Sequence, residues 1–540
     1  MTPPGTTTLT SGHVVRIFAR LRWRLLRGAI RHGGTQGFSV IIGIIAAVFI
    51  GLVGAGLIAG MGRVLIEPNP LLITFPVAIS AAIAALGVIA GVAQPIDPRI
   101  IAAEPLNDRQ LAIGLLTTSA FGPPGIAATM LGLGLFAGSV SGWVSLPICA
   151  MATLAFLATL LLISRTTVNL LGIFANRYPR LGQVTVGLMS LLFYGAFQFI
   201  SATANDLDRA GRRQVASVAR WTPPGQIGEA FAVADERPLA ALGHLALGAL
   251  WLPLLALVFM TTTRRVLASS GATSKRTGHS MASTSRVAAL VQRMCGTGPA
   301  GTIAWRSVRT RIRHPRTALE TFVGAGIGLA VVLFPALIRD GIGAAAVLAG
   351  GAVQLAVLFM AGNSIGSDGP ALGSEVMCGV EPETIIAGKV RSVVVVAAPL
   401  VIIGPLIGAA ATGEWEYLPA GFAVGIGGLF AGSGGAIIQS TLVPIAIPES
   451  DNPLASGDSG QGLLAAVVLA FVLIALTLVT LPVALGLLWA LERDSIGFVT
   501  LLSVAAVGGG WLVMQLGQRV AARRWRQREP EIYAAIIPTN

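Results

Sequence analysis

Two arginine-rich segments, each built around a tryptophan, are suited to binding phosphate groups at a membrane surface. Residues 23–35 recur 282 positions later as residues 305–317, with seven of thirteen positions identical. Arginine stems can reach toward lipid phosphates while a tryptophan ring lies at headgroup level. The recurrence indicates a duplicated unit, each copy of which places a basic segment at a membrane surface.

These side chains need helices to position them. Residues 14–31 predict an amphipathic helix in the plane of the interface, because apolar residues recur at three-to-four spacing and arginines line another face. Such an elbow helix either supports a cytoplasmic partner or serves as a plain topology anchor. The candidate elbow residues are Trp23, Arg24, Arg27 and Arg31 in the first copy and Trp305, Arg306, Arg309 and Arg313 in the second.

In each half, one acidic loop follows the second span. Asp97-Pro98 and Asp368-Gly369-Pro370 start tight turns, and negative charge near the next helix favours its amino end. Each loop is expected to hold a short charged helix that can push on two spans, or else to be a solvated connector. The candidate coupling residues are Asp97, Arg99, Glu104, Asp108, Arg109, Asp368, Glu375, Glu381 and Glu383.

Composition places the chain in a membrane. Of 540 residues 54% are hydrophobic and only 11% are charged, with a mean hydropathy of +0.78. We predict an all-α polytopic protein with about twelve transmembrane helices in two parallel six-helix repeats. The predicted spans lie at about 38–60, 71–94, 112–137, 143–164, 182–203 and 239–261 in the first repeat, and at about 319–338, 343–362, 390–412, 419–441, 463–490 and 496–516 in the second. The expected parts are an amino-terminal segment with its elbow helix at 1–37, a first six-span repeat at 38–261, a basic linker with the second elbow helix at 262–318, a second six-span repeat at 319–517 and a basic cytoplasmic tail at 518–540.

The arginine distribution predicts orientation. With the amino terminus inside, the cytoplasmic segments hold 29 of the 37 Lys and Arg residues, so both termini are expected in the cytoplasm. The net charge of +13 follows from this bias and needs no nucleic acid to explain it. Only two of these residues are lysines, which is typical of a GC-rich bacterial genome and favours the bacterial plasma membrane.

An outer segment is expected between the fifth and sixth spans. Residues 204–238 are too long for a simple turn and predict short interfacial helices around Trp221, Pro223, Pro224 and Gly225, the candidate outer gate. The matching segment of the second half, near Glu492, is very short.

Catalytic motifs were sought and not found in the sequence. No phosphate-cradling GxxxxGK[ST] motif occurs, and the histidines and three cysteines lack metal-binding spacing. We therefore expect a transport subunit that is not itself an enzyme and binds no metal or cofactor of its own.

The chain resembles the permeases of the ABC type-2 exporter class, in particular the fused two-repeat actinobacterial kind. The resemblance rests on the basic helix before the first span, the loop pieces around Asp97-Pro98-Arg99 and Glu104-Pro105-Leu106, and residues 363–369 with Gly388-Lys389. It implies two copies of a separate cytoplasmic ATPase, which hold ATP and Mg²⁺, and export of a small hydrophobic or amphipathic substrate such as a drug, antibiotic, peptide or lipid. The alternatives are an ion-gradient-driven transporter of the major facilitator type and an intramembrane enzyme for lipid or cell-wall precursors.

Overall fold

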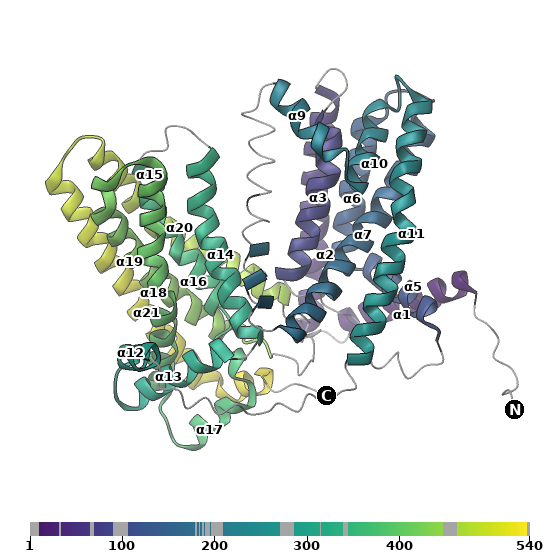
Figure 1. Ribbon diagram of the computed structural model, residues 1–540. Coiled ribbons are helices and arrows are strands. Elements are labelled where there is room, and N and C mark those ends of the chain that lie inside the picture. The colour runs from purple at the N-terminus through teal and green to yellow at the C-terminus, as the bar shows by residue number, and fades with distance from the viewer. Residues whose placement is uncertain are drawn as a thin grey trace, which may run out of the picture. The chain divides into compact units, whose positions relative to one another are not determined.

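The computed structural model is all α-helical wherever it describes the chain (Figure 1). It divides into two compact units, unit 1 (Met1–Arg177, Phe199–Thr273 and Leu454–Leu463) and unit 2 (Tyr178–Gln198, Ser274–Pro453 and Leu464–Asn540), each considered by itself. The structure describes residues 10–31, 34–64, 70–89, 106–178, 209–269, 286–313, 315–338, 344–446 and 462–536, with scattered positions between 181 and 195.

Unit 1 is a bundle of long apolar helices with shorter helices at its ends. In Figure 1, α1 and α5 lie at one end of this unit and α9 lies at the other. Its helices are α1 (Ser11–Arg31), α2 (Gly34–Val64), α3 (Pro70–Ile89), α5 (Asp108–Ala120), α6 (Pro123–Ser139), α7 (Ser145–Arg177), α9 (Arg209–Ala219), α10 (Pro223–Val233) and α11 (Pro238–Ser269).

Close approach between α2 and α6 depends on small residues. A Cβ at Gly62 would lie 2.8 Å from the carbonyl oxygen of Gly138, and one at Gly134 would lie 2.5 Å from the Cα of Ala55. Glycine at these positions lets two backbones pack directly, as helices in lipid commonly do. Beside this pair, α3, α7, α10 and α11 form the core around the fully buried Phe156.

The third predicted span, 112–137, is not one straight helix. Helices α5 and α6 are bent by 75° at a short break that contains Gly122, Pro123 and Pro124. Proline removes a backbone donor and restricts the residue before it, so the break follows from the sequence at that point.

Unit 2 is a second bundle, with short helices gathered at one end. Figure 1 shows α12, α13 and α17 together at that end. Its helices are α12 (Arg286–Cys295), α13 (Gly298–Arg313), α14 (Pro315–Ile338), α15 (Ala344–Leu348), η1 (Ala349–Ala352), α16 (Val353–Ala361), η2 (Gly366–Ala371), α17 (Leu372–Met377), α18 (Pro382–Thr412), η3 (Trp415–Tyr417), α19 (Leu418–Leu442), α20 (Gly462–Leu491) and α21 (Ile496–Ile536).

Helices α19 and α21 make the closest pair of unit 2. A Cβ at Gly510 would lie 2.3 Å from the carbonyl oxygen of Gly427, and one at Gly517 would lie 2.5 Å from that of Gly434. The two contacts are seven residues apart on both helices, so one glycine seam runs along the pair. This seam fixes α21 against the centre of the unit.

The chain is a polytopic membrane protein. Within the described residues, six helices are long and apolar enough to cross a membrane, namely α7, α11, α18, α19 with η3, α20 and α21, and the bent pair α5 and α6 makes a seventh if it forms one span. Other predicted spans fall on shorter apolar helices, among them α3, α14 and α16. The predicted span 182–203 lies largely outside the described residues.

Candidate functional site

The first elbow helix packs on the helix that follows the first loop. The predicted helix over residues 14–31 is present as α1, which buries Val14 and Phe18 against Leu111 of α5. The Phe18 ring lies over Gly114, where a Cβ would meet ring carbons at 2.6–2.7 Å. The elbow side chains Trp23, Arg24, Arg27 and Arg31 are all exposed.

The second elbow helix, α13, packs in the same way on α18. A Cβ at Gly388 would lie 2.8 Å from the carbonyl oxygen of Ala300 and 2.7 Å from Cγ2 of Ile303. Trp305 is half-buried, and the guanidinium of Arg309 lies 5.9 Å from its ring centroid. The side chain of Arg313 lies outside the described residues.

The two elbow contacts correspond in sequence. Phe18 and Ala300 are 282 positions apart, which is the offset between the two tryptophan segments. Gly114 and Gly388 are each the seventh residue of the helix that follows the acidic loop, α5 and α18. Each unit therefore sets the same elbow position against the same glycine of the helix that follows its loop.

In unit 2, four charged side chains from four elements (α13, η2, α17 and α18) form a largely buried cluster, here called the charge cluster: Arg306, Asp368, Glu375 and Lys389. Asp368 accepts hydrogen bonds from both Arg306 and Lys389. Nη2 of Arg306 also lies 2.7 Å from Oε1 of Glu375. The Lys389 side chain is 1% exposed and that of Asp368 is 6% exposed, whereas that of Arg306 is 34% exposed.

The charge cluster is formally neutral, with two acids and two bases, and this balance lets the charges stay buried. Burial raises the pKa of the Glu375 carboxyl, and the neighbouring Lys389 and Arg306 charges oppose that shift only in part. The cluster ties α13, the loop residues of η2 and α17, and α18 to one another. It brings Arg306, Asp368 and Glu375, three candidate residues, together around a fourth residue, Lys389, that was not among the candidates.

Backbone contacts hold the loop in place below the charge cluster. The Asn363 side chain donates to the carbonyl oxygen of Ile445 and accepts from its N–H, both at 2.9 Å, so it ties the end of α16 to the end of α19. The Ile365 N–H donates to Ser440 Oγ at 2.8 Å. Gly369 turns the chain with a φ of +52°, a conformation that side chains rarely adopt. The loop that presents Asp368 is therefore rigidly anchored.

The carboxyl-terminal part of α21 packs on the same loop. Residues 518–536, expected as a basic tail, continue the helix across a kink at Arg528 next to Pro530. Trp525 is 1% exposed and packs with Ile303, Leu372 and Ile386, and Arg526 pairs with Glu383 at 2.7 Å on the surface. Glu381, which precedes α18, is exposed.

Much of the first loop lies outside the described residues, including Asp97, Arg99 and Glu104. Where the structure resumes, Asn107 caps α5 in a reciprocal capping box with Gln110. Asp108 and Arg109 are exposed, and Asp108 lies 3.6 Å from Arg264 in a solvent-exposed pair.

The candidate outer gate is the turn between α9 and α10. Trp221 is 81% exposed, and Thr222 caps α10 by accepting from the N–H of Gly225 at 3.1 Å. Pro223 occupies the first turn of α10, where its missing N–H costs nothing, while Pro224 and Gly225 are buried. The two short helices expected in this segment are present.

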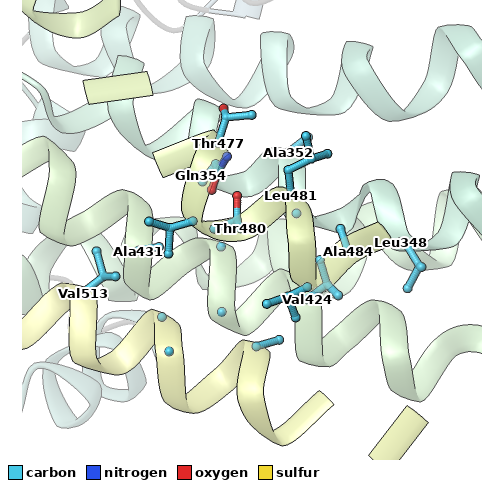
Figure 2. Close-up of a pocket in the computed structure, with 18 of the residues that line it drawn as sticks. Leu348, Ala352, Gln354, Val424, Ala431, Thr477, Thr480, Leu481, Ala484 and Val513 are labelled. Atoms are coloured by element: carbon cyan, nitrogen blue, oxygen red, sulfur yellow. The ribbon is translucent and has the colours of Figure 1, made fainter. Parts of the chain in front are cut away.

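Unit 2 also contains a cavity of about 380 Å³ between η1, α16, α19, α20 and α21. Its walls are mainly Gly, Ala, Val and Leu, and in Figure 2 the polar side chains of Gln354, Thr477 and Thr480 lie together among aliphatic ones. The Oε1 atom of Gln354 is buried and has no hydrogen-bond partner among the described residues. The sequence does not reveal this cavity, because glycines that line a cavity cannot be told by sequence from glycines that pack a helix pair.

Comparison with family models, with curated proteins and with solved structures found no match for this chain. Within the described residues, no group of three or more His, Cys, Asp or Glu side chains is arranged to hold a metal ion. The functional argument therefore rests on the geometry of the elbow helices, the charge cluster and the cavity.

Proposed function

We propose that this chain is the permease subunit of an ATP-driven exporter, with two parallel six-span repeats and both termini in the cytoplasm of a bacterium. The observation that carries the proposal is the pairing of each elbow helix with the helix after an acidic loop, at corresponding glycines in both units. A duplicated elbow and loop suits a pair of identical partners, one docked beneath each repeat.

The charge cluster supports a coupling role for the second loop. A force on η2 reaches α13 and α18 because Arg306 and Lys389 both bind Asp368, and a force on α17 reaches α13 through the pair of Glu375 and Arg306. A loop held by buried ion pairs and side-chain-to-backbone hydrogen bonds moves as one body with the helices that it joins, which a mobile connector would not do. Closure of a partner ATPase would thus shift the end of α18 and change the exposure of a pathway across the membrane.

The exposed candidate residues fit a docking face. Arg109 and Asp108 in unit 1 and Glu381 and Glu383 in unit 2 lie within seven residues of Gly114 and Gly388 in the chain and are exposed to solvent. Exposed charges change association rates and partner choice more than they change stability. ATP and Mg²⁺ belong to the partner in this proposal, and the chain itself performs no catalysis.

A second candidate function, ion-gradient-driven transport, is favoured by one observation. Lys389, Asp368 and Glu375 are buried ionisable groups beside a candidate span, and such groups often mark ion or proton pathways. The charge cluster, however, has two acidic and two basic groups, and Arg306 pairs with both acids. This arrangement suits a fixed structural role better than ion or proton transfer.

Purification from native membranes tests the proposal. The tagged chain, extracted in mild detergent, is expected to recover a cassette ATPase at two copies per chain with measurable ATPase activity. Arg306→Ala should lower that activity because it unties α13 from the loop. Arg293→Ala, which removes an exposed arginine of α12 outside the charge cluster and the candidate elbow residues, is the matched control and should leave the activity unchanged. A chain that purifies alone, and whose transport in vesicles collapses with a protonophore but not with ATP removal, would favour the ion-gradient candidate.

A further inference from the structure

The cavity of unit 2 has the dimensions of a small-molecule site. Its volume of about 380 Å³ lies within the range of natural ligand pockets, roughly 300–1,000 Å³. No charged side chain is among the described residues that line it.

Helix α20 borders the cavity, and two of its lining residues, Val479 and Leu481, are 54% and 47% exposed, so the cavity is open to the surroundings of the bundle at this helix. Leu476 and Leu487 of α20 are buried in cores on either side, and the stretch between them lines the cavity. The opposite face of α20 is apolar and exposed, with Leu478 70% exposed and Leu485 55% exposed. Since that face suits lipid and the cavity is open beside it, a molecule dissolved in the bilayer can enter the cavity directly.

One polar atom of the cavity indicates that a bound ligand has a hydrogen-bond donor. Gln354 Oε1 is buried at the cavity without a hydrogen-bond partner among the described residues. The nearby Thr480 hydroxyl already donates to the carbonyl oxygen of Leu476 at 2.9 Å. A buried acceptor that lacks a donor is costly, so a ligand that brings an N–H or O–H group gains binding free energy there. A water molecule would satisfy the acceptor but leave most of the apolar volume empty.

We infer that this cavity binds an uncharged, largely apolar molecule taken from the bilayer, which donates one hydrogen bond to Gln354. The inference does not rest on the proposed function, because binding at this site stands whether ATP, an ion gradient or neither drives the chain.

Photolabelling of the full chain in phosphatidylcholine nanodiscs tests the inference. The probe is 3-azioctanol, an uncharged eight-carbon alcohol with a photoreactive diazirine, and the adducts are mapped by mass spectrometry. We expect saturable labelling of the cavity-lining parts of α20 and α21, competed by unlabelled octanol. A matched diazirine that lacks the hydroxyl should label the same residues more weakly.

Two adjacent glycines of α21 offer a matched pair of variants. Gly509 lines the cavity and Gly508 does not, and a Cβ at either position would meet no atom within 4 Å. Gly509→Leu should therefore fill the cavity and abolish the saturable labelling, whereas Gly508→Leu should preserve it. Gln354→Leu should weaken labelling by the alcohol about fivefold, as expected for one lost hydrogen bond, and leave the probe without a hydroxyl unaffected.

Labelling that does not saturate, or that is unchanged in Gly509→Leu, would overturn the inference and show partition into lipid only. Equal losses of both probes in Gln354→Leu would overturn the hydrogen-bond assignment. Recovery of the partner ATPase is measured separately, so failure of this site and failure of the proposed function remain distinguishable.

Discussion

Loss of the Lys389 ammonium should destabilise unit 2 strongly. Lys389→Met keeps most of the aliphatic stem, so the variant leaves little new void. It removes the charge that binds Asp368 in a site where the two side chains are 1% and 6% exposed. Removing one partner of a buried ion pair costs about 3–5 kcal/mol. Because the half-exposed Arg306 still binds Asp368, we expect a loss near the lower limit, about 3 kcal/mol.

A double-mutant cycle separates this pair from its surroundings. In Lys389→Met/Asp368→Asn both charges are gone, while Arg306 keeps Glu375 at 2.7 Å. The double variant should recover most of the loss, with a coupling free energy of about 2–3 kcal/mol. Unfolding in mixed micelles with increasing SDS, followed by circular dichroism, measures the free-energy differences. Strictly additive losses in the double variant would refute the account of the charge cluster.

Three further predictions follow from other contacts. Gly114→Val should destabilise unit 1 because its side chain meets the Phe18 ring, and Phe18→Ala should partly restore the SDS midpoint; no restoration would contradict the elbow contact. Burial raises the folded-state pKa of Glu375, so this group's contribution to stability is greatest below its unfolded-state pKa and is lost as pH rises through the folded-state pKa. The SDS midpoint of the wild type should therefore fall as pH rises between the two pKa values, and the midpoint of Glu375→Gln should not. Arg526→Ala removes an exposed pair with Glu383 and should lower the free energy of unfolding by less than about 1 kcal/mol in the same titration. A loss as large as that of Lys389→Met would contradict the view that this exposed pair contributes little to stability.

The sequence predicted the class of the molecule well. An apolar, weakly charged chain has few folded alternatives to a helical membrane protein, and the amphipathic spacing of residues 14–31 placed the first elbow helix within a few residues. The acidic loop with a short helix was also predicted in the second half, where α17 follows Asp368. These features depend on local spacing, which sequence displays directly.

Contacts between distant segments could not be predicted in this way. Asp368 is 62 residues from Arg306 and 21 from Lys389, and neither spacing marks a pair. Trp525 was assigned to a basic tail because arginines surround it, although its ring is buried against the loop. The cavity at Gln354 is lined by residues of several helices that are far apart in the sequence, so it depends on tertiary packing rather than on any motif.

Site-specific photo-crosslinking in cells tests the docking of a cassette ATPase most directly. A photoreactive benzoylphenylalanine placed at Arg109 or at Glu381, both exposed and within seven residues of Gly114 or Gly388 in the chain, is expected to crosslink to a cassette ATPase. The same group at Trp221, which is 81% exposed in the turn between α9 and α10, should not. Crosslinks from Arg109 and Glu381 but not from Trp221 would support the permease account; an ATPase captured from Trp221 alone, or from none of the three positions, would contradict it.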